Sequence, residues 1–487
     1  MHGSIFPTVL LTCGLLVPHT LTFAQATWKR VHGAFANDSG VDMCTTADGH
    51  LVVVGSTGSF GSGSADVYAV KLDTLGNVLW SATYGGAEID RGLAVAGTPD
   101  GGAVIAGFSN RIVANGYDGI LMRISPEGQV MWETTLGGGA WDFLYDVAIT
   151  ADEGLVAVGQ TFEQGSGDVW VVRTDAAGDT LWTRTLGGAG VELANAVVVL
   201  DDGGIALTGS GEVDGQTDAL VVLLDAEGGA QWSRAVGGDS LDVGNDIIRT
   251  IDGRLSIVGN TRSYAQHLQH FHFLVDMDGN LVWSYPIGLV DDQLGSRHLQ
   301  LPSGEFVSIG TTRAFGAGES DMYLMKTNGP GEFILGQTQG GQQSETGSAL
   351  VRSVGGYILC GITDSFGSGG DDLFVVRTDE VGFTASDEVV ITFDPLGLDE
   401  GDAGDEAMVV FPSPCTGQLQ VRANEVMGTF RVHDMMGRSM LEQRANGLTA
   451  TLNLSLETGT YLLTVVTESG RLIRRKFIVQ ANSSFGR

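Results

Sequence analysis

Tryptophan recurs at almost constant spacing through most of this 487-residue chain. Neighbours are 50 to 52 residues apart, and the residues are Trp28, Trp80, Trp132, Trp182, Trp232 and Trp283, with Phe333 in the next position. An internal repeat of this length is the sequence signature of solenoids and propellers. Each repeat is then one small structural unit, and its apolar faces are buried by the neighbouring repeats.

Each repeat contains two turn signals that separate four short apolar segments. One turn has the pattern Asp-x-x-Gly just before the tryptophan segment, as at 175–178, and the other resembles Asp100-Gly101. In such turns Asp accepts local backbone N–H groups and Gly adopts a positive φ. Helical spacing of apolar residues is almost absent. The sequence therefore predicts an all-β fold with four strands per repeat.

A four-stranded sheet cannot bury both of its faces alone, so we expect the repeats at 25–385 to form a seven-bladed β-propeller. A linear solenoid is the alternative, but its end repeats would carry capping changes. The strand that begins at Trp28 precedes the first full repeat, and the last repeat ends near residue 378 without a tryptophan. We expect the Trp28 strand to complete the last blade and close the ring.

The periodic aromatic residues are expected to dock between adjacent blades, one per blade, because strict periodicity favours packing over ligand binding. Trp141 and Trp170 break the period. They are therefore better candidates for exposed aromatic residues that bind a ligand.

The N-terminus resembles a secretory signal peptide, expected at residues 1–24. Residues 5–21 are largely apolar, and Thr22-Phe23-Ala24 offers a cleavage site with small residues. The alternative is a buried N-terminal strand. No other apolar run approaches the roughly 20 residues that span a bilayer, so we expect no transmembrane segment in the mature chain.

The charge distribution marks a second boundary. The net charge is −32, but residues 409–487 contain nine Lys and Arg against five Asp and Glu. An acidic linker is expected at 386–408, followed by a domain at 409–480 and a tail at 481–487. A body this acidic repels phosphate backbones, so no nucleic-acid partner is expected.

Three cysteines remain after the signal peptide: Cys44, Cys360 and Cys415. They form no metal ligand set. Cys44 and Cys360 fall in the first and last repeats, which a closed ring brings near each other. A disulfide is conceivable there, but two separate thiols are favoured.

Several motifs follow one another in the C-terminal segment. It opens with VVFPSPCTG at 409–417 and continues with FRVHDMMGR at 430–438, LETGTYLLTV at 456–465 and RRKFIV at 474–479. In this order they resemble the type A sorting domain of the type IX secretion system, although Ser413 stands where Asn is usual. The motif residues are Phe411, Pro412, Pro414, Gly417, Asp434, Gly437, Leu456, Gly459, Tyr461 and Lys476.

This resemblance implies that the type IX secretion machinery is a partner and that the protein is exported through the periplasm to the outer surface or the medium. The alternating strands expected at 418–423, 429–434, 451–454, 461–468 and 472–479 predict a small β-sandwich. Its expected core is Val421, Phe430, Val432, Leu452, Leu454, Leu462 and Val465. An immunoglobulin-like adhesive domain is the alternative.

The segments that end in D-x-x-G-x-x-x-W resemble the repeats of quinoprotein-like propellers. That family typically holds its quinone cofactor under an adjacent Cys-Cys pair, which this sequence lacks. We therefore expect no cofactor. The resemblance implies the architecture and not an activity.

The sequence contains no common nucleophile, zinc-protease, phosphate-binding or EF-hand motif. His267, His270 and His272 are weak candidates for metal ligands, with His270 and His272 on one strand face; simple surface substitution is the alternative. Acidic loops at Asp321 and at Asp371-Asp372 could ligate calcium, although turn capping by the recurrent Asp is favoured.

Taken together, the sequence predicts an exported surface or extracellular protein whose propeller binds a glycan or protein ligand. The alternative is a secreted enzyme (a hydrolase, a lyase or a quinoprotein-like oxidoreductase) with acidic residues gathered at the central channel. A spacer without a specific ligand is a third reading. Propellers host all three roles, so the fold does not choose among them.

Overall fold

The computed structural model describes residues 27–110, 116–288, 290–367, 370–385, 389–393, 408–411, 418–434, 438–456, 459–467 and 472–479. All regular elements in these ranges are β-strands. No helix that could cross a membrane occurs among them. The predicted signal peptide and the predicted tail lie outside the described residues.

The strands between residues 28 and 393 form six four-stranded sheets and one five-stranded sheet in the described part of the chain. The first two sheets in chain order contain β2 (Asp42–Thr45), β3 (Leu51–Thr57), β4 (Asp66–Leu72), β5 (Val78–Tyr84), β6 (Asp90–Gly97), β7 (Ala103–Ser109), β8 (Asp118–Ile124) and β9 (Val130–Leu136). The third and fourth contain β10 (Asp142–Ile149), β11 (Leu155–Thr161), β12 (Asp168–Thr174), β13 (Thr180–Leu186), β14 (Leu193–Val199), β15 (Ile205–Val213), β16 (Gln216–Leu224) and β17 (Ala230–Val236).

The fifth and sixth sheets contain β18 (Asp242–Arg249), β19 (Leu255–Thr261), β20 (Gln269–Val275), β21 (Leu281–Ile287), β22 (Gln293–Gln300), β23 (Phe306–Thr312), β24 (Asp321–Thr327) and β25 (Phe333–Gln339). The last sheet contains β26 (Glu345–Ser353), β27 (Gly356–Thr363), β28 (Asp372–Asp379), β1 (Trp28–Gly33) and β29 (Val389–Phe393), in that order. Within each sheet the four repeat strands run antiparallel, as the two turn signals per repeat predict.

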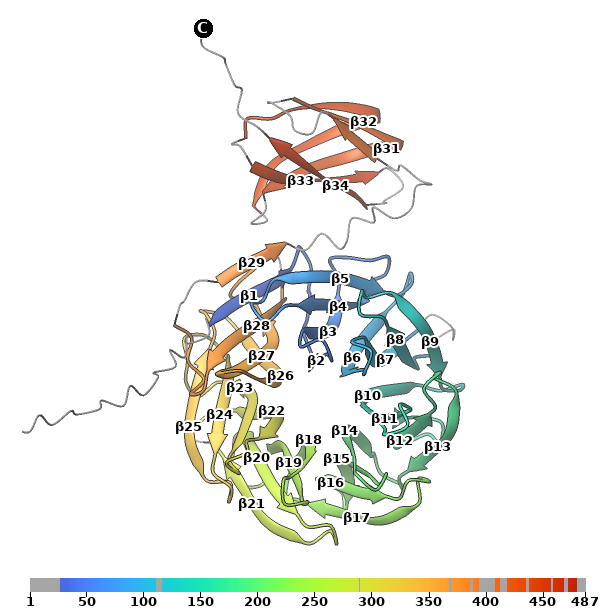
Figure 1. Ribbon diagram of the computed structural model, residues 1–487, viewed down its shortest axis with the longest axis vertical. Helices are drawn as coiled ribbons and strands as arrows, with labels where there is room; N and C mark the ends of the chain where they lie inside the picture. Colours follow the sequence, from blue (N-terminus) through green and yellow to red (C-terminus); the bar gives the residue numbers. More distant parts are fainter. Residues whose placement is uncertain are drawn as a thin grey trace, which may run out of the picture.

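The sheets are arranged radially around a common centre, as Figure 1 shows. The innermost strand of each sheet contacts the innermost strand of the next, and β26 contacts β2. The ring is therefore closed, which excludes an open stack. This is a propeller-like arrangement.

The strand that begins at Trp28 closes the ring as predicted. It pairs antiparallel with β28, so that Trp28 lies opposite Arg377. The first strand of the chain and the last repeat therefore share one sheet, and unfolding of either end would open the ring.

Residues 389–393 correct one expectation about the linker. They were expected in a solvated acidic segment, but they form β29, which pairs in parallel with β1. The sequence VVITF is rich in β-branched residues, which favour strands, and the outer edge of β1 offers unpaired backbone groups. The remainder of the expected linker up to residue 407 lies outside the described residues.

Six of the periodic tryptophans dock on the neighbouring sheet, as predicted. Ring atoms of Trp28 lie 3.0 Å from the position that a Cβ on Gly76 would take. The same relation joins Trp80 to Gly128, Trp132 to Gly178, Trp182 to Gly228, Trp232 to Gly279 and Trp283 to Gly331. Each glycine belongs to the hairpin turn before the outer strand of the next sheet and has a positive φ, between 78° and 94°. Four of these turns read Asp-x-x-Gly, whereas Ser125 and Asn328 stand in the Asp position before Gly128 and Gly331. Only glycine allows both this turn and this ring contact.

Phe333 does not follow the pattern, and the expectation for that position is wrong. Its side chain is 53% exposed, and the corresponding Gly382 faces Leu324 and Gln337 instead. Phenylalanine lacks the indole N–H that Trp80 donates to the Pro126 carbonyl at 2.8 Å. Gln339 of the same strand donates to the Gly382 carbonyl at 3.0 Å, and buried apolar residues such as Leu324 and Phe374 hold the rest of this seam.

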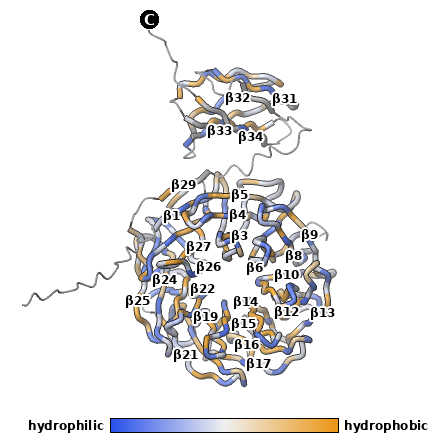
Figure 2. The backbone as a smooth tube through the Cα atoms, in the orientation of Figure 1, coloured by the Kyte–Doolittle hydropathy of each residue, from blue (hydrophilic) through white to orange (hydrophobic). Residues whose placement is uncertain are grey.

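The apolar core is divided among the seams between neighbouring sheets. One such cluster joins Val54 and Val67 of the first sheet to Ile105 and Ile120 of the second. Figure 2 shows hydrophobic stretches on strands all around the ring. Stability is therefore distributed over many equivalent interfaces.

The C-terminal domain is one five-stranded antiparallel sheet that folds back on itself. Its strands are β30 (Met408–Phe411), β31 (Gln418–Asp434), β32 (Ser439–Asn453), β33 (Gly459–Thr467) and β34 (Leu472–Val479). The two strands expected at 418–423 and 429–434 are one long strand with a register shift between Arg422 and Met427. The terminal strands β30 and β34 contact each other, so the sheet encloses a core.

That core contains most of the residues predicted for it. The confirmed members are Val421, Phe430, Val432, Leu452, Leu454 and Val465. Leu462 is buried but lies outside this cluster, and Leu463 belongs to it instead. Because side chains alternate along a strand, the expectation at this point is one residue out of phase.

Candidate functional site

Three carboxylates and one guanidinium meet at the centre of the ring. Asp42, Asp146 and Asp246 lie on the innermost strands β2, β10 and β18, and Arg297 lies on β22. The guanidinium nitrogens are 3.7 Å from Asp42 Oδ2, 3.2 Å from Asp146 Oδ1 and 3.2 Å from Asp246 Oδ1. Since these strands belong to four sheets, one side chain links opposite sides of the ring.

The fold positions each carboxylate by a hydrogen bond across a seam. Every one of the three aspartates accepts a backbone N–H from the innermost strand of the next sheet. The donors are Val95 for Asp42, Val197 for Asp146 and His298 for Asp246, each at 2.8 Å. The three aspartates therefore brace neighbouring sheets as well as binding the guanidinium.

Burial dominates the electrostatics of this centre. It raises the pKa of Asp42 to about 6, although the nearby Arg297 opposes the shift. Burial also raises the pKa of Asp146, again against Arg297. For Asp246 burial acts in the same direction, but the hydrogen bonds and charge of His298 outweigh it and lower the pKa to about 2. In this cluster, Asp246 therefore stays negatively charged, whereas the carboxyl of Asp42 titrates near neutral pH.

A hydrogen-bonded relay continues from the centre into the seam between the fifth and sixth sheets. His298 Nδ1 lies 2.7 Å from Asp246 Oδ2, and His298 Nε2 lies 2.9 Å from Ser256 Oγ. Ser256 Oγ in turn lies 2.8 Å from His272 Nε2. The order Asp–His–Ser is that of a hydrolase triad. Ser256 is completely buried, however, so its hydroxyl is closed to a substrate in this structure.

These central acids are the gathering of carboxylates that the enzymatic alternative expects. The guanidinium of Arg297 lies among them, where a substrate would have to bind. The arrangement is therefore suited to locking the ring. The sequence analysis did not identify the cluster of Arg297 with three aspartates. Asp42, Asp146 and Asp246 nevertheless lie at matching positions of their repeats.

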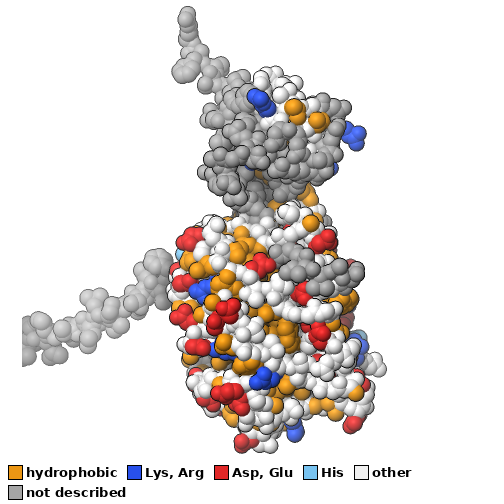
Figure 3. Space-filling model, turned by 90° about the vertical axis from the view of Figure 1, so that its right-hand side faces the viewer, with side chains coloured by type: hydrophobic (Ala, Val, Ile, Leu, Met, Phe, Trp, Pro, Cys, Tyr) orange, Lys and Arg blue, Asp and Glu red, His pale blue; other side chains and the backbone are white. Residues whose placement is uncertain are grey.

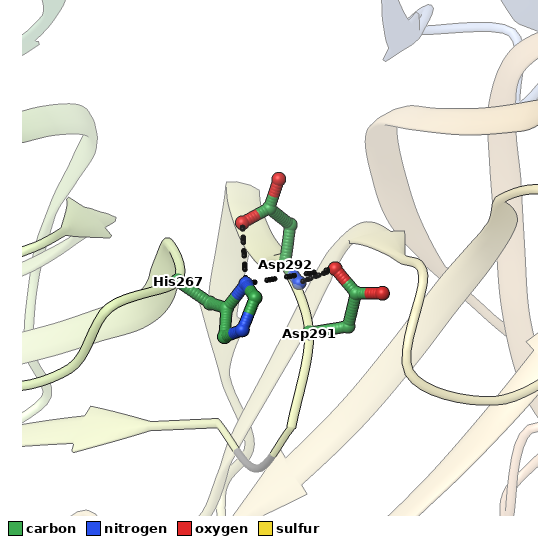
Figure 4. A group of neighbouring side chains, drawn as sticks. All are labelled: His267, Asp291 and Asp292. Carbon is green, nitrogen blue, oxygen red and sulfur yellow. Dashed lines mark hydrogen bonds and ion pairs between the residues drawn. The ribbon is translucent and has the colours of Figure 1, made fainter.

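The three candidate metal-binding histidines are not brought together. His267 is half exposed, and its Nδ1 lies 3.8 Å from Asp291 Oδ1 and 4.0 Å from Asp292 Oδ1, as Figure 4 shows. Both oxygens also accept backbone N–H groups, from Asp292 and Leu268 respectively. Asp291 thus orders its own loop, Asp292 ties that loop to the one that carries His267, and a protonated His267 would add an ion pair.

His270 and His272 lie on β20, with ring centroids 6.4 Å apart. Both are buried, and burial lowers the pKa of His270 to about 3. His272 is bonded to Ser256 and lies between the rings of Trp283 and Phe306, with centroid distances of 4.8 Å to each. These two imidazoles are neutral core groups in this structure.

A pocket of about 540 Å³ lies near the ring closure, but a second pocket of about 530 Å³, between the second and third sheets, has the more distinctive lining. Its walls combine the carboxylates of Asp142 and Glu163 with the indole of Trp170. They also carry five threonines: Thr135, Thr161, Thr180, Thr183 and Thr185. A concave site with an aromatic wall and several convergent polar groups is the usual form of a small-ligand site.

Trp141 lies on the loop that borders this pocket. It is 49% exposed, as the sequence predicts, and its ring is held edge-on by Tyr117 at 5.6 Å and Phe162 at 6.4 Å. Glu163 fixes the same loop by accepting the Gly139 N–H at 2.7 Å. The exposed indole therefore belongs to the loop whose glycines line the pocket, although its own ring is outside that lining.

Trp170 is only 7% exposed, so the expectation of an exposed ring is wrong. It lies opposite Gly159 in the pairing of β11 with β12. Tyr68 lies opposite Gly55, and Phe271 opposite Gly259, at the equivalent positions of other sheets. Trp170 therefore occupies a repeated core position, which the glycine of the partner strand could have revealed.

Cys44 and Cys360 are free thiols, in agreement with the favoured expectation, and Cys360 is fully buried. Cys415 lies outside the described residues.

Six of the ten sorting-motif residues lie in the described part of the C-terminal domain, five of them on strands. Tyr461 and the partly buried Leu456 pack in its core, and Gly459 begins β33. Phe411 ends β30, Asp434 lies opposite Tyr461 at the end of β31, and Lys476 lies opposite Leu462. The remaining motif residues Pro412, Pro414, Gly417 and Gly437 lie outside the described residues.

Comparison with solved structures finds other proteins of low sequence identity. PorZ of Porphyromonas gingivalis, titled an essential bacterial surface component of the type-IX secretion system, is 12% identical; the match covers 89% of this chain and 58% of PorZ, with a TM-score of 0.41. This chain thus spans little more than half the length of PorZ. Sqt1 of Chaetomium thermophilum is 11% identical over 72% of this chain and 97% of its own, with a TM-score of 0.43. A putative 6-phosphogluconolactonase of Bacteroides fragilis is 13% identical over 70% and 94%, also with a TM-score of 0.43.

Comparison with curated protein sequences gives no match. The family model of the secretion system C-terminal sorting domain matches residues 409–480, the range that the motifs predict. These residues form a type IX secretion sorting domain, and the protein is exported to the cell surface or the extracellular space.

Proposed function

We propose that this protein is an exported binding module: a seven-bladed propeller that binds a glycan in the pocket between its second and third sheets. The observation that carries the proposal is the lining of that pocket, where carboxylates, threonines and an indole meet beside the exposed Trp141. The sorting domain delivers the propeller to the outside of the cell, where glycans are abundant ligands.

The chemistry of the pocket suits a sugar. Carboxylates accept hydrogen bonds from sugar hydroxyls, and threonine hydroxyls both donate and accept. An exposed, rigid aromatic face covers the apolar C–H face of a sugar ring at little entropic cost. The alternative ligand, a protein, would need a larger contact area than this pocket offers.

The surroundings select against anionic ligands. Figure 3 shows acidic side chains scattered over this side of the ring, where β9 and β13 form the rim. Asp142 and Glu163 place two more carboxylates in the pocket itself. We therefore expect neutral or amino sugars to bind in preference to uronic acids or sulfated sugars.

The blade count in this proposal is supported by the strand order. Six sheets of four strands and one of five lie between residues 28 and 393 of the described chain, and the contact of β26 with β2 closes the circle. The tryptophan spacing gives the same number independently.

The test is a glycan array with the purified protein, followed by calorimetry with the best ligand. Trp141→Ala is expected to weaken binding at least tenfold, about 1.4 kcal/mol, and Glu163→Gln to weaken it by a similar factor. Phe333→Ala is the matched control, since Phe333 is an equally exposed aromatic residue far along the ring. Absence of any glycan ligand, or equal losses in Trp141→Ala and Phe333→Ala, would refute the proposal.

A further inference from the structure

Pairs of acidic residues recur where one sheet passes to the next. One acid lies at or near the start of the third strand of a sheet, and the other lies at or just before the start of the innermost strand of the following sheet. Examples are Asp66 with Asp90, Asp168 with Glu192, and Asp218 with Asp242. The two carboxylates flank the connecting glycine, and the same pattern surrounds Gly137, Gly340 and Gly33.

The pair at Gly237 shows how close these carboxylates lie. Asp218 Oδ1 is 2.3 Å, and Asp242 Oδ2 is 2.5 Å, from the position that a Cβ on Gly237 would take. Any side chain there would collide with both oxygens, which explains the glycine that ends each tryptophan strand. The two oxygens are near enough to share one cation. Asp242 Oδ2 also accepts the Gly238 N–H at 2.9 Å and the Ser263 hydroxyl at 2.6 Å, which orient the carboxylate.

At two seams a carboxylate oxygen lacks a hydrogen bond. Asp242 is completely buried, and its Oδ1 accepts no hydrogen bond, nor does Asp218 Oδ1. At the preceding seam Asp168 is 4% exposed, and its Oδ2 is likewise without a hydrogen bond. Unsatisfied buried oxygens of charged groups are costly and usually bind an ion or water.

One seam shows that the fold does not need this charge. Gly288 faces Gln269 instead of an acid, and the buried Gln293 begins β22 in the position of the second acid. The strands of this seam are paired as in the others. Neutral amides therefore suffice to build a seam, so the carboxylates elsewhere serve a further purpose.

We propose that each seam carboxylate pair binds a calcium ion that joins adjacent sheets. Calcium takes six to eight oxygen ligands at about 2.3–2.6 Å in flexible geometry, and two carboxylates supply up to four of them. Backbone carbonyls and water complete such sites readily. Magnesium demands a near-ideal octahedron and holds its water, so it fits a shared carboxylate pair less well.

Two acids that the sequence pointed to for calcium belong to this pattern. Asp321 faces Gly340 together with Glu345, and Asp372 faces Gly33 together with Asp38. The sequence analysis placed them in two separate acidic loops. The structure adds the second carboxylate from the neighbouring sheet.

The experiment measures metal content and thermal stability of the full protein after chelation, after reloading with calcium, and after reloading with magnesium. We expect several calcium ions per chain and a rise in Tm with calcium that magnesium does not reproduce. The double variant Asp218→Asn, Asp242→Asn keeps the shape of the seam and is expected to bind one calcium fewer. The exposed acid Asp201, which pairs with Arg249 away from the seam glycines, gives the control Asp201→Asn, which should bind the wild-type number of calcium ions.

Because the first double variant could fail to fold, Asp168→Asn, Glu192→Gln at the preceding seam is a second test with the same expectation. Loss of one ion in a folded double variant supports the proposal. A protein without bound calcium, whose Tm calcium does not change, overturns it and leaves a shared proton between the two carboxyls. Equal calcium content in wild type and both double variants also overturns it, since the ions then lie elsewhere.

Discussion

Replacing Arg297 by methionine tests the charged centre of the ring most directly. Methionine keeps much of the volume of the side chain and removes the charge that faces Asp42, Asp146 and Asp246. The arginine side chain is 21% exposed and the three carboxylates are 6–10% exposed, so water screens the group weakly. Removing one partner of a buried ion pair costs about 3–5 kcal/mol.

The loss of stability in Arg297→Met is limited because carboxyls that have lost the guanidinium can become neutral by binding protons. Neutralising at pH 7 a carboxyl whose pKa is about 6 costs about 1.4 kcal/mol, and Asp42 has that pKa. Asp246 keeps its hydrogen bonds with His298. We therefore expect a loss of about 3 kcal/mol in the free energy of unfolding at pH 7, at the lower end of the range for buried pairs.

The pH dependence has a definite sign. The folded-state pKa of Asp42 lies above its ordinary value of 3.8, so its proton is held more tightly in the folded state. The stability that this proton provides is fully present below pH 3.8 and is lost as the pH rises through the folded pKa. Removing the guanidinium raises that pKa further. The deficit of the Arg297→Met variant should therefore be small near pH 4 and largest above pH 7.

The assay is urea unfolding followed by tryptophan fluorescence at several pH values. All eight tryptophans lie between residues 28 and 283, so the signal reports the ring and not the sorting domain. Arg249→Met is the control: its ion pair with Asp201 is exposed at both ends, and its loss should cost less than about 1 kcal/mol. Wild-type stability of Arg297→Met at pH 7, or a deficit that does not change with pH, would show that the central ion pairs do not hold the ring.

Three further predictions concern the seams, the thiols and export. Gly228→Ala should destabilise the ring by about 2 kcal/mol more than Gly215→Ala in urea unfolding. Both glycines have a positive φ, so both substitutions strain the backbone. Only at Gly228 would the added Cβ also lie 2.8 Å from Trp182, because Gly215 faces open space. Equal losses would mean that the indole does not pack there. Cys360 is fully buried, and burial raises the pKa of its thiol, so a thiol reagent should label it only on unfolding; rapid labelling of the native protein would contradict its placement. Deleting residues 409–480 should leave the protein inside the cell envelope, as measured by fractionation and immunoblotting, and surface display of the truncated chain would argue against the sorting role.

Much of the fold could be predicted because the same sequence pattern recurs from repeat to repeat, so that one interpretation applies to many of them. Trp80 and Trp182 each lie in the outer strand of a sheet and each meet the turn glycine of the next sheet, as the spacing predicts. A residue that recurs at the same position of equal units faces the same neighbour in each. The prediction failed at Phe333, where the repeat itself changes and a polar contact replaces the indole.

The candidate sites were harder to predict. Trp141 was recognised as exposed because it departs from the repeat, but the same reasoning failed for Trp170, which fills a core position shared with Tyr68 and Phe271. The pocket beside Trp141 depends on side chains from two sheets, and no spacing in the sequence indicates that they converge.

The sequence alone determined the all-β repeat and the sorting domain, because short local patterns encode them, and a comparison of the first and last repeats predicted the closing strand. Local alternation and turn residues set the strands, and the C-terminal motifs lie within 72 residues. Only the tertiary structure decided that Arg297 reaches Asp42, more than 250 positions away, and that Asp218 faces Asp242 across a seam. Such contacts depend on how the closed ring orients its sheets, which no single repeat contains.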